Sequence, residues 1–278
     1  MKQLCIANIV NKKYQGYIPF YIYYVFRLYP DYSVFIYTDS TLNPHVKESL
    51  KLLEGMGEFK IKPLNYKCDK NNIQAFKTLR WVLYDKEFND FENIYIGDID
   101  ILLLKEKLPL LEAHINHCRE QNLPYSNCVR TGNKKLTGLH FMQTEPYFKK
   151  TLPAIKKYQR LIEANKFNGH NEETLLKIIT ESQLTLPTKQ GDYINHHGLH
   201  LRVFVRNVPI SQYKRLKNYA FTRIFKHYYK QFWEATTEKK FSQLMNIAKK
   251  CRYSRDADPY SQISNVKRLC IEAEKGRL

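Results

Sequence analysis

The sequence lacks the cysteine spacings and the long apolar runs that mark several classes of protein. Its six cysteines form no C-x-x-C pair and no Cys/His zinc pattern, so we expect reduced thiols in a cytoplasmic protein. Residues 17–29, the longest apolar stretch, are interrupted by Pro19 and Arg27 and cannot span a bilayer, which needs about 20 apolar residues. The strand-like residues 4–10 are too short for a signal-peptide core. A membrane-spanning or secreted protein is therefore not expected.

Positive charge is in large excess. A formal charge of +18 on 278 residues indicates an anionic partner, which can be a nucleotide, a nucleic acid or an acidic lipid. The excess lies mainly in residues 202–278, which contain 18 Lys and Arg against 6 Asp and Glu. With 43% hydrophobic residues the chain can bury a sizeable core. We expect a main domain over residues 1–208 and a basic, aromatic-rich helical extension over residues 209–278.

The first hundred residues alternate between strand and helix patterns. Short apolar or alternating runs predict strands at residues 4–10, 34–37, 59–62, 93–96 and 139–143. Helical spacing of apolar residues predicts helices at residues 18–29, 43–53, 73–83, 109–121, 147–165 and 172–182. Repeated βα units favour an α/β fold with a mostly parallel sheet flanked by helices. Ligands bind beyond the carboxyl ends of such strands, where Asp39 and Asp98 are expected.

The sharpest local signal is the D-x-D sequence of Asp98, Ile99 and Asp100. Two carboxylates at this spacing converge on one hard cation if the backbone turns, and Gly97 permits a turn. The ordinary alternative is a hydrogen-bonded, solvated turn. Apolar residues flank the motif on both sides, which places its acids at the edge of a core, where a cation offsets the cost of burying them. This favours a site for Mn²⁺ or Mg²⁺.

At this point the chain resembles the GT-A glycosyltransferases, particularly the family-eight type that transfers galactose or glucose. The resemblance covers about residues 1–205. It rests on the amino-terminal strand with Tyr14, the helix with Arg80 before the D-x-D strand, the small-Gly-apolar segment at Gly138, an acidic helix start at Glu172, and a His-containing glycine loop at Gly198. The resemblance implies a Rossmann-like GT-A catalytic domain that uses a nucleotide sugar, with a UDP-hexose favoured, and a saccharide or lipid-linked acceptor.

The expected site residues follow from the motif and the resemblance together. Donor binding is expected from Ala7, Asn8, Tyr14, Asp39, Lys77, Arg80, Asp98, Ile99, Thr137, Gly138, His140 and Gly198. The expected metal ligands are Asp98, Asp100 and His197, and the expected catalytic residues are Asn171, Glu172 and Glu173. The His-x-x-Gly-x-x-Lys spacing of the family is not reproduced, so the third ligand stays open among His196, His197 and His200. Glu172 stands where the family has Gln, and a carboxylate there is suited to a general base, which leaves retention or inversion open.

Several of these residues have ordinary alternatives. Arg80 can be a surface charge on an amphipathic helix, and His140 can be a hydrogen-bonded core histidine. Glu172 and Glu173 are favoured at a helix start by the macrodipole alone.

The carboxy-terminal extension interleaves basic and aromatic side chains over residues 213–233. This composition suits the headgroup region of an anionic membrane, and it also suits nucleic acid. The third alternative is a helical segment packed on its own domain with solvated charges. We favour the membrane, which fits a lipid-linked acceptor in surface polysaccharide or lipopolysaccharide synthesis and a peripheral place on the inner face of the cytoplasmic membrane. Nucleic acid is not expected, and the sequence indicates no oligomeric state.

Two other functions are weighed against a transferase. A phosphatase of the haloacid dehalogenase type also uses a D-x-D, but on its first strand and with Thr or Val two residues after the motif, where this chain has Leu102. A basic nucleic-acid-binding protein accounts for the extension but leaves the paired carboxylates without a role.

Overall fold

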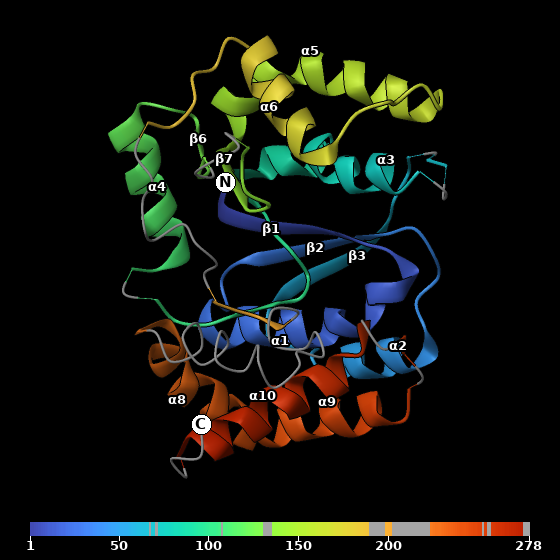
Figure 1. The fold of residues 1–278 in the computed structure, drawn as a ribbon, viewed down its shortest axis with the longest axis vertical. Helices are drawn as coiled ribbons and strands as arrows, with labels where there is room; N and C mark the ends of the chain where they lie inside the picture. Colours follow the sequence, from blue (N-terminus) through green and yellow to red (C-terminus); the bar gives the residue numbers. More distant parts are fainter. Residues whose placement is uncertain are drawn as a thin grey trace, which may run out of the picture.

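The chain folds around a six-stranded, mostly parallel β-sheet with helices on both faces (Figure 1). The computed structural model describes residues 1–66, 68–69, 72–106, 108–129, 135–188, 198–201, 223–251, 253–254 and 257–274. In spatial order the strands are β3 (Glu58–Pro63), β2 (Ser33–Thr38), β1 (Lys2–Val10), β4 (Phe91–Ile96), β7 (His140–Gln143) and β6 (Tyr125–Ser126). The expected α/β class, with a mostly parallel sheet between helices, is confirmed.

Strand β1 lies in the middle of the parallel part of this sheet. Ala7 lies opposite Phe35 of β2 and opposite Ile96 of β4, and both pairings are parallel. A strand with two neighbours and helices on both faces is buried over most of its length, which is why residues 4–10 form a nearly unbroken apolar run. Because β1 and β4 run in the same direction, the residues after Val10 and after Ile96 meet at one edge of the sheet.

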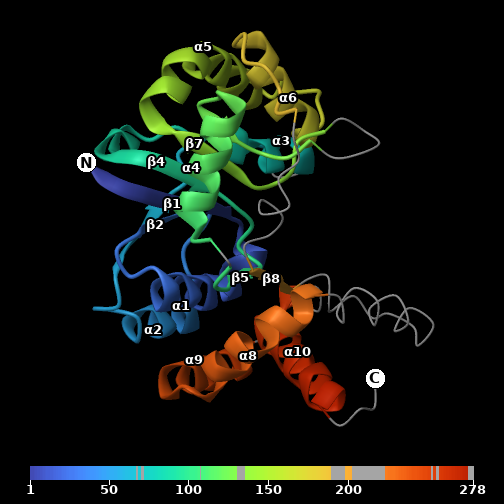
Figure 2. The same cartoon turned by 90° about the vertical axis from the view of Figure 1, so that its left-hand side faces the viewer.

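The helices form layers on the two faces of the sheet (Figures 1 and 2). One face is covered by α3 (Ile73–Thr78), α5 (Thr144–Glu163) and α6 (Asn171–Glu181). The other is covered by α1 (Ile18–Leu28) and α2 (Pro44–Lys51), while α4 (Leu110–Gln121) lies beside β6. Within the described ranges, no helix combines the length and the apolar character needed to cross a bilayer.

The carboxy-terminal helices form a further layer against α1 and α2 (Figure 2). They are α8 (Arg223–Thr237), α9 (Lys239–Lys249) and α10 (Pro259–Glu274). The Phe241 ring lies 5.7 Å from Phe20, 5.5 Å from Tyr23 and 6.0 Å from Tyr24, measured between ring centroids. The extension thus shares the hydrophobic core of the α1 face. The expected boundary between residues 208 and 209 lies outside the described residues.

A small antiparallel ribbon beside the main sheet was not indicated by the sequence, and neither was the two-residue strand β6. Strand β5 (Ile101–Leu103) pairs with β8 (Gly198–His200), so that Ile101 lies opposite His200 and Leu102 opposite Leu199. Three residues are too few for a periodic pattern, and the two strands lie far apart in the chain. The helix expected over residues 73–83 is also shorter, because it tightens into a 3₁₀ turn at Leu79–Trp81.

Candidate active site

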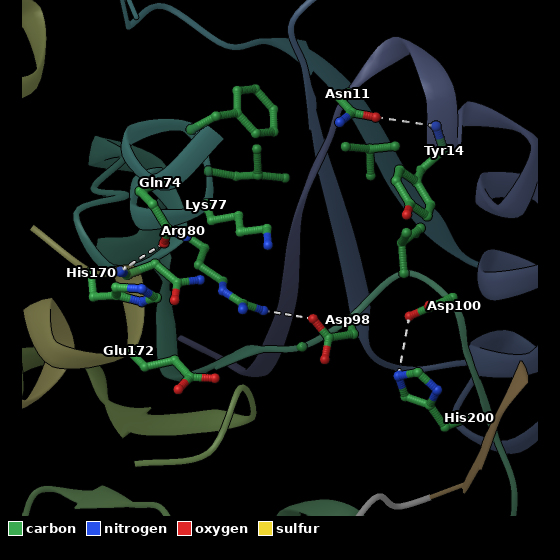
Figure 3. Close-up of a pocket in the computed structure, with 16 residues that line it drawn as sticks. Asn11, Tyr14, Gln74, Lys77, Arg80, Asp98, Asp100, His170, Glu172 and His200 are labelled. Carbon is green, nitrogen blue, oxygen red and sulfur yellow. Dashed lines mark hydrogen bonds and ion pairs between the residues drawn. The ribbon is translucent and has the colours of Figure 1, made fainter. Parts of the chain in front are cut away.

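A pocket of about 400 Å³ opens at the carboxyl edge of the parallel strands (Figure 3). Its walls come from the ends of β1 and β4, from the 3₁₀ helix Lys12–Tyr17, from α3, from the start of α6 and from β8. Of the expected site residues, the pocket lining contains Tyr14, Lys77, Arg80, Asp98, Ile99, Asp100, Asn171 and Glu172. His200, one of the three histidines considered for the third metal ligand, also lines the pocket, and so do Asn11, Gln74 and His170, which were not among the expected site residues.

Asp98 is held from one side by Arg80. The Arg80 Nη1 atom lies 2.6 Å from Asp98 Oδ1, and the guanidinium carbon lies 4.4 Å from the centroid of the Trp81 ring. A Cβ atom at Gly138 would lie 3.2 Å from Asp98 Oδ2, closer than nearly all real Cβ contacts. Glycine at position 138 therefore leaves room for the second carboxylate oxygen. The ion pair with Arg80 therefore orients the Asp98 carboxylate.

Asp100 lies beside His200 because strands β5 and β8 pair. The Asp100 Oδ1 atom is 3.6 Å from His200 Nε2, and the Leu201 N–H donates to the Asp100 carbonyl at 2.9 Å. Asp100 is buried, with 7% of its surface exposed. Of the three histidines considered for the third ligand, His196 and His197 lie outside the described residues, and His200 is the one that the structure places next to Asp100.

The donor set of this pocket fits a divalent ion that is shared with a phosphate. Asp98 and Asp100 offer carboxylate oxygens to one cavity, and these are the ligands that Mn²⁺ and Mg²⁺ prefer. His200 adds an imidazole nitrogen, which a transition metal such as Mn²⁺ accepts more readily than Mg²⁺ does. Among the side chains that the structure describes, no group of three converges closely enough to hold an ion by itself. Mg²⁺ is commonly bound through one or two carboxylates together with substrate phosphates, which agrees with an incomplete protein shell.

Cationic and aromatic side chains face the carboxylates across the pocket (Figure 3). Lys77, in the last turn of α3, and Arg80 lie on one wall. Tyr14 lies on the other, and its N–H donates to Asn11 Oδ1 at 3.2 Å. The pocket therefore brings carboxylates and cationic side chains together in one cavity.

The amino-terminal end of α6 closes a third side. The Asn171 N–H donates to Gln74 Oε1 at 3.3 Å, which ties α6 to α3. Glu172 lines the pocket, whereas Glu173 does not belong to its lining. Lys135 Nζ lies 3.8 Å from a Glu172 oxygen and 3.6 Å from a Glu173 oxygen, and thus partly balances both charges.

Ala7 and Asn8 lie in β1 beneath the pocket and do not belong to its lining. The Asn8 Nδ2 atom donates to the Gly97 carbonyl at 2.9 Å. Asn8 thus supports the turn that carries Asp98.

His140 and Thr137 lie in a buried hydrogen-bond network away from the pocket. The two ring nitrogens of His140 lie 3.1 Å from Asn127 Nδ2 and 3.0 Å from Tyr147 Oη. The Thr137 hydroxyl donates to Asn127 Oδ1 at 2.9 Å. Burial lowers the pKa of His140 to about 3, so its imidazole stays neutral at physiological pH. His140 is thus a hydrogen-bonded core histidine, the ordinary alternative given for it in the sequence analysis.

Asp39 lies in a second cavity, of about 760 Å³, that adjoins the first. The two cavities share Asn11 and Phe76 in their linings. Asp39 Oδ1 accepts the Lys12 N–H at 2.9 Å, which ties the loop after β2 to the loop after β1.

No family model and no curated protein matches this chain. Glycosyltransferases are among the solved structures that resemble it. GlyE of Streptococcus pneumoniae TIGR4 matches with a TM-score of 0.42 and 11% identity over 81% of this chain and 52% of its own, about half its length. The galactosyltransferase LgtC, in complex with donor and acceptor sugar analogues, matches with a TM-score of 0.35 and 12% identity over 63% of this chain and 70% of its own. Core-mannan synthase A of Aspergillus fumigatus, in an Mn/GDP form, matches with a TM-score of 0.42 and 6% identity over 64% and 70%. At these values the function has to be argued from the site.

Proposed function

We propose that the protein is a glycosyltransferase that moves a hexose from a nucleotide sugar, in the first place a UDP-hexose, to a saccharide or lipid-linked acceptor. The observation that supports this most is the arrangement across the first pocket. Asp98 and Asp100 stand on one side with His200, and Lys77 and Arg80 line the same cavity. Carboxylates for a divalent ion beside cations for phosphate match a metal-bound diphosphate better than a phosphatase nucleophile or a nucleic-acid backbone.

The roles of the residues follow from charge. Breaking the bond between sugar and diphosphate builds negative charge on the departing diphosphate. A divalent ion held by Asp98, Asp100 and a histidine of residues 196–200 would act as a Lewis acid on that group. Lys77 contributes a second positive charge in the same cavity, while Arg80 keeps Asp98 oriented through the 2.6 Å ion pair.

The start of α6 supplies the groups for the acceptor side. Glu172 lines the pocket opposite Asp98 and Asp100 and can accept the proton of an acceptor hydroxyl (Figure 3). Asn171, beside it, can hold the transferred sugar by hydrogen bonds. Glu173 shares Lys135 with Glu172 and so influences the charge on the proposed base.

A donor screen tests this function directly. UDP-, GDP- and CMP-sugars are incubated with the full chain, with Mn²⁺ or with EDTA, and the released nucleotide is measured. We expect slow hydrolysis of a UDP-hexose that requires the metal, because water can replace a missing acceptor. The same screen with Glu172→Gln should lose turnover but keep nucleotide binding. Absence of binding and hydrolysis for every donor, with and without metal, would overturn the proposal.

We further propose that the carboxy-terminal helices hold the enzyme on an anionic membrane, where a lipid-linked acceptor of surface polysaccharide synthesis would lie. Support comes from four exposed lysines of the extension: Lys230 on α8, Lys239 and Lys249 on α9, and Lys250 directly after α9. Each Lys near an acidic bilayer contributes about 1 kcal/mol of binding free energy at low salt.

Vesicle sedimentation tests the membrane proposal. Changing those four lysines to Gln should release the protein from acidic vesicles at low salt. The matched control changes four exposed lysines outside the extension, Lys86 and the three α5 residues Lys149, Lys150 and Lys156, and should keep binding. Equal binding of both variants, or binding to single-stranded or duplex nucleic acid but not to acidic vesicles, would contradict it.

A further inference from the structure

The side chain of Gln231, on α8, binds both backbone groups of one residue next to the active site. Its Nε2 atom donates to the Lys105 carbonyl at 2.8 Å, and the Lys105 N–H donates to its Oε1 atom at 2.5 Å. The amide of Gln231 therefore pairs with Lys105 much as a neighbouring strand would. Lys105 follows β5, the strand that begins directly after Asp100.

Strand β5 decides where Asp100 and His200 lie relative to each other. Its only ladder partner in the described structure is β8, and the two pair over three residues. A ribbon this short is not stable alone and depends on contacts from outside. The hydrophobic core around α1 supports one face of β5, and the hydrogen bonds of Gln231 support the chain just after its carboxyl end.

A second contact joins the extension to the opposite wall of the pocket. Gly16 lies in the 3₁₀ helix Lys12–Tyr17, which also carries Tyr14. A Cβ atom at Gly16 would lie 2.6 Å from the Tyr253 ring and 3.0 Å from Pro259. The extension therefore packs directly against this backbone, and it touches two of the segments that form the pocket.

We propose that the carboxy-terminal helices are a positioning part of the active site and that Gln231 is the residue that holds its Asp100–His200 end. Gln231 does not touch the pocket; it acts through Lys105 and β5. The inference rests on the proposed function in taking Mn²⁺ and a nucleoside diphosphate as the ligands. It also implies that the extension cannot be removed without changing the site, because Phe241 would leave the core of α1.

The test compares two variants that each remove a hydrogen bond between the extension and the main domain. Gln231→Met keeps the length of the side chain and removes both bonds to Lys105. Lys240→Met removes the bond from Lys240 Nζ to the Leu52 carbonyl, 2.6 Å long, at the end of α2 and outside the pocket lining. Affinity for Mn²⁺ in the presence of UDP is measured by electron paramagnetic resonance, together with the melting temperature.

We expect Gln231→Met to bind Mn²⁺ about tenfold more weakly than the parent. Loss of a residue that supports a metal ligand typically lowers metal affinity by about ten- to hundredfold, and Gln231 acts on the site only through β5, so the lower value is expected. Lys240→Met should bind like the parent even where its melting temperature falls equally. Gln231→Glu keeps the acceptor for the Lys105 N–H and loses the donor, so its affinity should be intermediate. Equal Mn²⁺ affinity of the parent, Gln231→Met and Lys240→Met would overturn the inference.

Amide hydrogen exchange separates this inference from the proposed function. Exchange over residues 101–105 should be faster in Gln231→Met than in Lys240→Met, whether or not a ligand is bound. If the parent binds neither Mn²⁺ nor UDP, the proposed function is wrong. If residues 101–105 exchange equally fast in both variants, the inference about Gln231 is wrong as well.

Discussion

The Asp100→Ala protein is expected to lose Mn²⁺-dependent binding of UDP, by at least about a hundredfold, while its fold stays intact. The loss follows because the ion connects the protein to the diphosphate, and a direct ligand contributes at least as much affinity as the outer-shell partners whose loss costs ten- to hundredfold. The fold should survive because the bond from the Leu201 N–H to residue 100 uses the backbone carbonyl and not the side chain. Calorimetric titration of UDP with Mn²⁺ measures the effect.

The control for this experiment is Asp90→Asn, at an exposed position away from the pocket lining, which should bind like the parent. Asp100→Asn adds a second test, because it keeps the size of the side chain and removes its charge. Both Asp100 variants should behave alike if charge and ligation matter. Equal UDP affinity in the parent and in Asp100→Ala, with and without chelator, would contradict the metal site.

Gly198→Ala is expected to destabilise the protein and to weaken Mn²⁺ binding at the same time. A Cβ atom at Gly198 would lie 2.0 Å from the Leu102 carbonyl oxygen and 2.8 Å from the Leu103 Cα atom. Both are backbone atoms that cannot rotate away, so β8 has to move off β5 and carry His200 away from Asp100. Overpacking of this kind costs about 3 kcal/mol, or about 6 °C or more in melting temperature for a chain of this size.

Gly55→Ala provides the comparison. Gly55 has a φ of 80°, and a Cβ atom there would meet nothing within 4 Å. This substitution adds backbone strain of about 1 kcal/mol away from the pocket and should leave Mn²⁺ affinity unchanged. Calorimetric melting and the Mn²⁺ titration are run on both variants. If Gly198→Ala loses stability but binds the ion like the parent, the ribbon does not position the ligands.

The elements that carry the site could be read from local sequence. Residues 4–10 form an apolar run and lie in the central strand β1. The helix expected from residue 43 begins as α2, where Asn43 Oδ1 accepts the His45 N–H at 2.9 Å. Asp98 and Asp100 follow β4 directly, so their place at the sheet edge depends on strand direction alone. These signals are local because propensity, capping and spacing act within a few residues.

The partners of those residues were decided only by tertiary structure. His200 reaches Asp100 because two strands of three residues pair, and no periodicity can appear in so short a run. His140 lies in the core, where β7 pairs antiparallel with β4, although its sequence position suggested the donor pocket. Gln231 reaches Lys105 across 126 residues of chain. Contacts of this kind follow from the packing of whole layers. The local sequence of one segment does not indicate which distant segment it will contact.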